Sequence, residues 1–542
     1  MAIETIQSGV WSVVPALLAI SLAWYTRDAI IGLFLGVTSA ALIYGGLQPA
    51  AAGVPDAWVG TTLGTVAGVV FGLKLVPDLI ASANLFGSLW YIKNVLLAIF
   101  AIGGLIGLMI RSGAIRGVLE ALTERVESAE DAEKATFLAG IVVHIDDYFN
   151  CLVVGTMMRP LTDKYNVSRA KLAYYVDSAG SPAARLAFYS TWGAAMVGFI
   201  GAGLVQAKKQ GILPDAYSEF VTTTSGGDVQ AVADAIWPLF FNTLFTGFYS
   251  WAALGLAALV AWQVFPNVGG MAEEERRARS GGGVLGEEHN PMISEEMADY
   301  EMYEGATPDW KNFLVPILTM VVVGLLAMFW TGEAIVSTGP TGSLALNIGG
   351  VQLGLASMSA LVVAFVLYRV RGDIPSNEDA VDAVVVGMKG IFLAAVILLF
   401  ATAIQNAVTT LGISSFVTNV FSGVPGWIVP VALFLTSSFV SFSDGSSWST
   451  YGIMFPIAIP IAFTTPANLI LVLGAVFSGG IFGDHCSPIS DTTVLASSTS
   501  GADHMVHVRT QIPYALVSAG IAATLFLVLG FVLPEGWQII PY

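Results

Sequence analysis

A cluster of polar side chains interrupts an apolar region near the carboxyl-terminal end of the chain. The segment reads "SGGIFGDHCSPISDTTVLASS", residues 478–498, and follows the apolar run "NLILVLGAVF". It combines two aspartates, a histidine and several hydroxyl groups, and carboxylate and hydroxyl oxygens are ligands that hard cations prefer. Where a helix unwinds, freed backbone carbonyl groups add further oxygen atoms. The segment therefore predicts a cation site at a broken helix.

A second polar interruption of the same kind occurs much earlier in the chain. The apolar segment from about 172 to 203 contains "DSAGSP", residues 177–182, which is similar to "DHCSP", residues 484–488. Pro182 cannot donate a backbone hydrogen bond and Gly180 loosens the backbone, so the helix should break there. Both segments are therefore predicted to be discontinuous helices.

Each predicted broken helix is preceded by a polar segment between two apolar arms. These segments are "HIDDYFN", residues 144–150, and "FSDGSS", residues 442–447. Basic residues lie on both sides of the first segment, which indicates that both flanks are cytoplasmic. They are Arg111, Arg116, Arg125 and Lys134 before it, and Arg159, Lys164, Arg169 and Lys171 after it. A segment that enters and leaves on one side is a re-entrant hairpin, although a single straight span remains an alternative.

The composition places these segments in a lipid bilayer. Of 542 residues, 55% are hydrophobic and only 11% are charged, too few for a soluble protein of this size. We expect an all-α polytopic membrane protein with about 11 transmembrane helices plus two re-entrant helical hairpins. The apolar runs of spanning length include 9–25, 29–46, 88–110, 237–264, 312–330, 346–368, 390–411 and 511–533. The start of the chain lacks the pattern of a secretory signal, so its first apolar run is expected to remain as a helix.

The two hairpins and two breaks follow one another in the same order in both halves. Asp147 and Asp444 are 297 positions apart, and Asp177 and Asp484 are 307 apart, so the offsets differ by a short insertion. Counting spans places the second hairpin on the opposite side, which predicts two inverted-topology repeats with discontinuous helices. The predicted divisions are an extra N-terminal helix 1–27, a first repeat 28–264, an acidic linker 265–311 and a second repeat 312–542.

The charged residues say more about location than about mechanism. Acidic residues exceed basic ones by 39 to 22, giving a net charge of −17, and much of the excess lies in 265–311. Arg276, Arg277 and Arg279 favour a cytoplasmic position for this stretch, which we expect to be a flexible connector in a cell-membrane protein. The acidic surface argues against nucleic-acid binding and suggests a halophilic host. Cys151 and Cys486 are expected to be buried thiols without a disulfide.

Buried carboxylates are the main functional candidates. A charge at the centre of a bilayer costs at least about 2.5–3.5 kcal/mol, so charged residues there usually have a role. The candidate Na⁺/H⁺ site comprises Asp146, Asp147, Asn150, Asp177, Ser181, Asp444, Ser446, Asp484, Ser487, Asp491, Thr492 and Thr493. His144 and His485 suit a supporting hydrogen bond or proton transfer better than Na⁺ ligation, and plain packing is an equal alternative.

The two long polar segments also resemble a known family. "HIDDYFNCLVVGTMMRPLTDKYNVSRAKLAYYVDSAGSP", and "GGIFGDHCSPISDTTVLASS" followed by "DHMVHVRTQIPYAL", are similar to the motifs of the NhaC-type sodium/proton antiporter family within the ion-transporter superfamily. The resemblance covers about 135–515 and implies two inverted repeats and a secondary carrier. It implies either exchange of Na⁺ against H⁺ or coupling of Na⁺ to a small solute.

Arg185 departs from the family pattern, in which this position is usually apolar or small. In one interpretation it pairs with Asp177 or another core carboxylate and so belongs to a cation antiporter. In the other, its planar fork binds the carboxylate of an organic substrate. Trp192 and the neighbouring Phe188 and Tyr189 could then line a solute pocket, although ordinary packing also explains such aromatic residues.

The leading hypothesis is a sodium/proton antiporter that works by alternating access, with Na⁺ and H⁺ competing for buried aspartates. The alternative is a sodium-coupled transporter or exchanger of a small carboxylate or amino acid that uses Arg185. A channel would need a continuous polar pore instead of paired breaks. The protein is not expected to be an enzyme, since no HExxH or paired-cysteine spacing occurs. No cofactor beyond Na⁺ as transported or coupling ion is expected, and a homodimer is compatible with this architecture.

Overall fold

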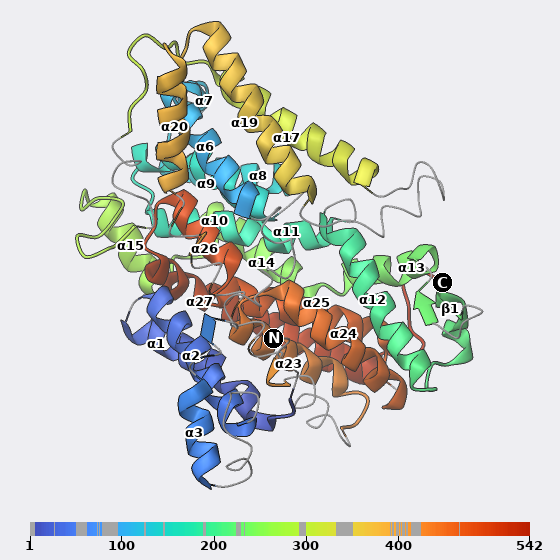
Figure 1. Cartoon of the computed structure of the whole chain (residues 1–542). Coiled ribbons are helices and arrows are strands. Elements are labelled where there is room, and N and C mark those ends of the chain that lie inside the picture. Colours follow the sequence, from blue (N-terminus) through green and yellow to red (C-terminus); the bar gives the residue numbers. More distant parts are fainter. Residues whose placement is uncertain are drawn as a thin grey trace.

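The computed structural model shows a predominantly helical chain (Figure 1). It describes all residues except 1–5, 27, 50–61, 73, 75, 78–95, 124–125, 145–146, 188–190, 224–228, 232, 292–299, 332–350, 391, 393–394, 397–399, 401–402, 404–406, 408–409, 413–423, 466 and 542. The predicted span 390–411 and the predicted site residue Asp146 therefore lie largely or wholly outside the described residues.

The first half of the chain contains short and medium helices and one small β-hairpin. Its elements are η1 (Gly9–Ser12), α1 (Val14–Thr26), α2 (Ala29–Leu47), α3 (Thr62–Gly72), α6 (Leu97–Arg111), α7 (Ala114–Thr123), α8 (Ala129–Val142), α9 (Asp147–Lys164), α10 (Arg169–Ala179), α11 (Ser181–Leu186), α12 (Thr191–Lys209), η5 (Asp215–Phe220), β1 (Val221–Thr223), β2 (Val229–Ala231), α13 (Ala233–Phe245) and α14 (Phe248–Ala261).

The second half is helical in all its named elements. They are α15 (Gly269–Arg279), α17 (Trp310–Thr331), α19 (Val351–Arg371), α20 (Asn377–Gly390), α23 (Val429–Asp444), α24 (Ser447–Thr464), α25 (Leu469–Cys486), α26 (Asp491–Ser500) and α27 (His504–Val532).

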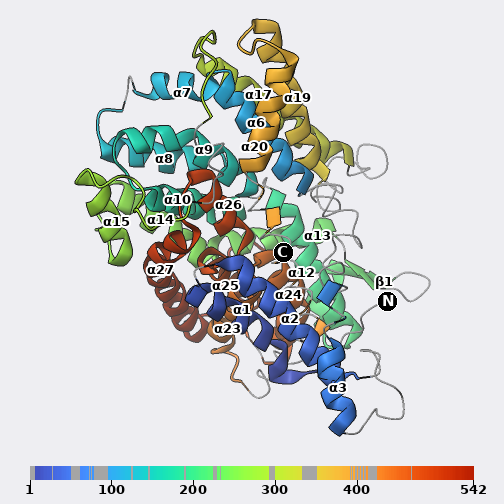
Figure 2. The ribbon, with the colours of Figure 1, turned by 60° about the vertical axis from the view of Figure 1, so that its left-hand side comes forward.

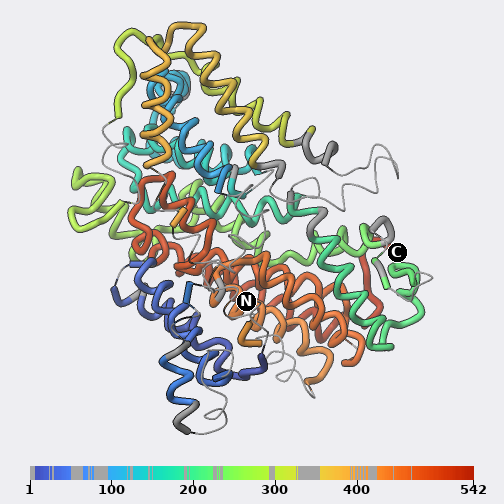
Figure 3. Tube along the Cα trace, in the orientation of Figure 1, coloured from blue at the N-terminus to red at the C-terminus, as the bar shows by residue number. Residues whose placement is uncertain are grey.

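The helices form three groups along the length of the molecule. Helices α6, α7, α17, α19 and α20 gather at one end, and α1, α2 and α3 lie at the opposite end (Figures 1 and 2). The carboxyl-terminal helices α23, α24, α25 and α27, in orange and red, lie beside α1 and α2, and α10, α11 and α26 lie between them and the first group (Figures 1 and 3). The predicted broken helices therefore occupy the middle of the structure.

Several helices have the length and composition of membrane spans. In the described residues, five helical segments are long and apolar enough to cross a bilayer: Ile30–Leu47, Ile236–Ala261, Gly354–Arg371, Leu469–Cys486 and His504–Val532. Shorter apolar helices at 97–111 and 310–324 coincide with further predicted runs, and a third at 429–443 is an arm of the second predicted hairpin. The predicted continuous run 237–264 is interrupted, since α13 ends at Phe245 and α14 begins at Phe248.

The second arms of the two predicted hairpins match in position and length. Helix α9 covers 147–164 and α24 covers 447–464, so both ends are offset by 300 positions. The first arms, α8 and α23, begin at 129 and 429 with the same offset, and Pro160 and Pro460 occupy equivalent places in the second arms. With this offset, Asp147 is equivalent to Ser447 in the second hairpin. The predicted equivalence of Asp147 with Asp444 was therefore off by three residues.

Both predicted helix breaks are present. Helix α10 ends at Ala179 and α11 begins at Ser181, whereas α25 ends at Cys486 and α26 begins at Asp491. The backbone closes in the same way at each break: Gly180 N donates to Asp177 O at 3.2 Å, and Ser487 N donates to Asp484 O at 3.1 Å. The predicted correspondence of Asp177 with Asp484 therefore agrees with the backbone geometry.

Two features differ from the predictions. Strands β1 and β2 form an antiparallel pair of three residues each, with Val221 opposite Ala231, a local addition that leaves the predicted helical class intact. The acidic segment is not simply a flexible connector, because α15 within it packs on α10 and α27. Buried ion pairs fix this helix, and sequence patterns do not reveal partners so distant in the chain.

Gly445 connects the two arms of the second hairpin in a left-handed conformation with φ of 71°. An added Cβ would lie 2.5 Å from the backbone oxygen of Ile489, which belongs to the second break. We expect Gly445→Ala to lower the free energy of unfolding by about 1–2 kcal/mol or more, because L-residues avoid this conformation. The midpoint of thermal unfolding in detergent measures the effect. Gly520→Ala, at a helical position where nothing lies within 4 Å of the added Cβ, is the control and should not destabilise.

Candidate functional site

Each hairpin tip contacts the helix break that follows it in the chain. In the first half, Ser181 Oγ at the start of α11 donates to Asp147 Oδ2 at the start of α9, at 3.3 Å. In the second half, Ser447 Oγ at the start of α24 donates to Asp484 Oδ2 near the end of α25, at 2.7 Å. The carboxylate lies on the hairpin in one half and on the broken helix in the other. Both halves thus make the same contact between a hairpin tip and a helix break, but the serine and the aspartate have changed places.

Contacts between the halves bring these two arrangements into one cluster. Tyr148, next to Asp147, donates its hydroxyl hydrogen to Asp491 Oδ2 at the start of α26. Ser178 Oγ, beside the first break, lies 3.1 Å from His485 Nε2 beside the second. The predicted polar segments therefore converge although about 300 residues separate them in the sequence.

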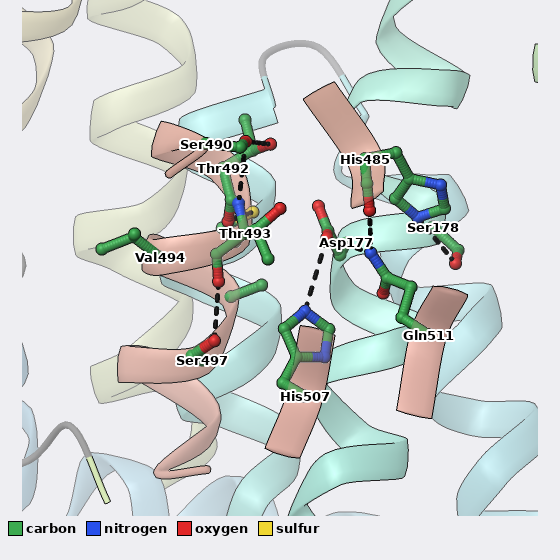
Figure 4. Close-up of polar contacts among 12 residues, drawn as sticks. Asp177, Ser178, His485, Ser490, Thr492, Thr493, Val494, Ser497, His507 and Gln511 are labelled. Atoms are coloured by element: carbon green, nitrogen blue, oxygen red, sulfur yellow. Dashed lines mark hydrogen bonds and ion pairs between the residues drawn. The ribbon is translucent and has the colours of Figure 1, made fainter. Parts of the chain in front are cut away.

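Asp177 has the most unusual surroundings in this cluster. Its side chain is fully buried, and its Oδ2 accepts a hydrogen bond from Gln511 Nε2 at 2.6 Å and lies 3.4 Å from His507 Nε2. Figure 4 shows Asp177 between these two side chains of α27. His507 and Gln511 are four positions apart, so they share one face of the helix. The second oxygen, Oδ1, has no hydrogen-bond partner among the described residues.

The other predicted aspartates with described side chains have donors to both carboxylate oxygens. Asp147 accepts from Trp192 Nε1 at 3.1 Å as well as from Ser181. Asp484 accepts from Ser490 Oγ at 2.6 Å as well as from Ser447. The remaining one is Asp491, which accepts from Tyr148 and from the Thr492 backbone N at 2.9 Å. Asp177 Oδ1 is thus the carboxylate oxygen of this set that has no hydrogen-bond donor among the described residues.

Uncharged oxygen atoms without partners occur near Asp177. Asn150 binds the carbonyl oxygen of Ala179 through Nδ2 at 3.3 Å, while its own buried Oδ1 has no partner in the described structure. Gln511 Oε1 is also buried and has none there. No group of three or more His, Cys, Asp or Glu side chains among the described residues could hold a metal ion. A cation at this place would therefore depend on Asp177 together with amide, hydroxyl and backbone oxygens.

The remaining predicted residues mostly support the breaks and helix starts. Ser487 Oγ donates to Phe442 O at 2.8 Å, and Thr493 Oγ1 donates to Asp484 O at 3.4 Å. Ser446 caps α24 by accepting from the Ser449 backbone N, and Thr492 Oγ1 lies 3.1 Å from Ser490 Oγ. His144 Nδ1 lies beside Ile141 O at the end of the first arm. Asp444 ends α23, and its side chain lies outside the described residues.

Comparison with known proteins gives the family. The model of the Na⁺/H⁺ antiporter family matches residues 217–531. An uncharacterized protein of Haemophilus influenzae is 30% identical over 540 residues, which cover 98% of this chain and 93% of the relative. The chain belongs to the Na⁺/H⁺ antiporter family. The predicted NhaC-type resemblance is thereby confirmed, and members of such a family are multi-pass membrane carriers of Na⁺ and H⁺.

Two further relatives of this antiporter match over shorter regions. The Malate-2H(+)/Na(+)-lactate antiporter of Bacillus subtilis is 42% identical over 101 residues, covering 19% of this chain and 22% of the relative. The Na(+)/H(+) antiporter NhaC of Alkalihalophilus pseudofirmus is 29% identical over 150 residues, covering 28% and 32%. Both named relatives are antiporters, although one of them also carries organic anions.

Arg185 of this antiporter does not form the predicted ion pair with Asp177. No carboxylate of the described residues lies within ion-pair distance of its guanidinium group. The side chain is fully buried, with Nη2 donating to Thr243 O at 2.8 Å and the guanidinium carbon 4.9 Å from the centre of the Phe477 ring. Its Nε and Nη1 have no partner in the described part of the chain.

Sequence reasoning missed several residues that touch the cluster directly. Tyr148, Ser178, Ser447 and Ser490 lie inside the predicted polar segments but were not named as site residues. Three others come from α14 and α27. His507 and Gln511 reach Asp177, and Tyr249 donates or accepts at 2.7 Å from His485 Nδ1. A signal existed for the first two, because "HVRTQ" places them four positions apart in an otherwise apolar helix. His485 is held between Ser178 and Tyr249, which fits both the predicted supporting role and plain packing.

Proposed function

We propose that this protein exchanges Na⁺ for H⁺ across the membrane, with both ions competing for Asp177. The observation that carries the proposal is the buried Oδ1 of Asp177, which lacks a donor in the described structure. A buried carboxylate without its full set of donors gains by binding either a proton or a cation, and binding one excludes the other. His507, Gln511 and Asn150 would then hold the carboxylate and complete the ligand set.

The route across the membrane would follow from two inverted repeats. We propose that α8–α9 and α23–α24 are re-entrant hairpins entering from opposite sides, with the linker 265–311 in the cytoplasm. The equal helix lengths and the two tip-to-break contacts support this proposal. Movement of the hairpins and broken helices against the remaining spans would expose Asp177 to each side in turn.

A second candidate is coupling of Na⁺ to a small carboxylate or amino acid. Two observations favour it: the buried Arg185, whose guanidinium group has no carboxylate partner among the described residues, and the relative from Bacillus subtilis named as an antiporter of malate and lactate. Arginine suits a carboxylate because of its planar arrangement of donors.

Transport by purified protein in sealed vesicles tests the proposal. A Na⁺ gradient should drive an opposite movement of protons, recorded by a trapped pH-sensitive dye, with no organic solute present. Protein-free vesicles and K⁺ gradients serve as controls. If protons move only when a labelled lactate, malate or amino acid is also present, the second candidate is correct and simple Na⁺/H⁺ exchange is wrong.

A further inference from the structure

We propose that the break between α13 and α14, together with Arg185, forms a binding site for the carboxylate group of a small organic solute. This site is separate from the aspartate cluster, and the inference depends on the protein being a carrier as proposed above. The evidence is that the buried guanidinium group of Arg185 lies both at the end of α13 and at the start of α14.

The carboxyl-terminal end of α13 uses one nitrogen atom of Arg185. Nη2 donates to Thr243 O, and the last carbonyl groups of a helix carry partial negative charge. This contact explains the position of the guanidinium group, but it provides an acceptor for only one of the three nitrogen atoms. Nε and Nη1 keep their hydrogen atoms inside a fully buried environment without an acceptor in the described structure. Such donors are costly to leave unpaired.

The amino-terminal end of α14 lies against the same guanidinium group. A Cβ added to Gly247, the residue that precedes α14, would lie 2.9 Å from Nη1 and 3.1 Å from the guanidinium carbon. Gly247 has no side chain to cap this 14-residue helix, and Ser478 Oγ accepts only from the Tyr249 backbone N, at 3.5 Å. The buried Ser250 hydroxyl in the first turn lacks a partner in the part of the chain that is described. A helix start of this kind favours an anion.

The positive end of α14 and a guanidinium group without a counter-ion among the described residues repel each other, and an anion bound by the free donors of Arg185 would offset this repulsion. The described residues supply no carboxylate here, so the anion should come from outside. An organic carboxylate fits best because it can accept two parallel N–H bonds from arginine. Aromatic side chains are also close, since Phe477 contacts Arg185 and Tyr451 packs on Phe477, and they suit the carbon skeleton of a solute.

Thermal unfolding of the detergent-purified protein tests this site. Lactate and malate, the two probes, should raise the unfolding midpoint of the wild-type protein, whereas chloride at equal ionic strength should not. Arg185→Met should abolish this response but keep the response to Na⁺. Without any ligand it should not lower the midpoint, because it removes a buried cation that has no counter-ion among the described residues.

The matched control is Lys171→Met, because Lys171 is also fully buried but is paired with Glu133 and Glu275. This control should lower the midpoint in the absence of ligand. A second variant, Gly247→Ala, should displace the flexible guanidinium tip and weaken carboxylate binding by about tenfold or more, which corresponds to one charge-assisted hydrogen bond.

Three results would overturn the proposal. One is a wild-type protein that ignores both carboxylates, the second is equal stabilisation by chloride, and the third is an Arg185→Met protein that still responds to them. The result of the vesicle experiment does not depend on this site, because Na⁺-driven proton movement is measured there without a carboxylate. A protein that binds lactate or malate through Arg185 but moves no protons would refute simple exchange and leave this site intact.

Discussion

Asp177→Asn is expected to abolish Na⁺-driven proton movement in vesicles while the protein stays folded. Asparagine has nearly the same shape and can still accept the hydrogen bond from Gln511. It carries no negative charge and cannot be protonated at neutral pH, so neither ion is bound as before. We expect the exchange rate to fall by about 100-fold or more, the typical contribution of a positioned proton-transfer group.

Two controls separate loss of the ion site from loss of the fold. Asp215→Asn changes an exposed aspartate outside the cluster and should leave the exchange rate unchanged. The unfolding midpoint of Asp177→Asn should not decrease, because the substitution removes a buried charge that is only partly satisfied. Exchange at the wild-type rate in Asp177→Asn would show that the competition between Na⁺ and H⁺ occurs elsewhere.

The helix breaks could be predicted from the sequence because their causes are local. Gly180 with Pro182, and the polar segment around Pro488, interrupt helices through their own backbone chemistry, and both breaks are present. The meeting of hairpin tips and breaks followed from the repeat, which the order of motifs already indicated. Ser181 and Asp484 indeed contact the tips.

Features that depend on tertiary packing could not be predicted in this way. The offset between the two repeats is set by where the helices begin and end. Aligning aspartate with aspartate gave the wrong offset for the hairpins, because the carboxylate lies on the hairpin in the first half and on the broken helix in the second. The break before α14 has no proline at the junction, so the apolar run 237–264 looked continuous. The surroundings of Arg185 depend on α13, α14 and α25, which lie far apart from it in the sequence.

The acidic segment provides the clearest example of a hidden partner. Helix α15 brings Glu275 to Lys171 on α10, with 3.7 Å between Oε2 and Nζ, and Lys171 also pairs with Glu133 on α8 at 2.7 Å. Arg279 of α15 contacts both glutamates. Two positive and two negative charges therefore balance inside the protein. They connect the first hairpin, the first broken helix and the linker.

Lys171→Met should destabilise the protein by about 3–5 kcal/mol, the usual cost of removing one partner from a buried ion pair. The methionine fills similar space, so the loss comes from the charge: Glu133 is fully buried and would share only Arg279 with Glu275. Denaturant or thermal unfolding in detergent measures this loss.

A second substitution, Glu133→Gln, made in the same protein should restore a large part of the stability, because Arg279 can then neutralise Glu275 alone. If the double variant is no more stable than Lys171→Met, the ion pairs do not hold the linker helix on the hairpin, and shape complementarity between α8, α10 and α15 does. If it recovers, the linker is fixed to the elements that carry Asp147 and Asp177, and any movement of the first hairpin must carry α15 along or break these pairs.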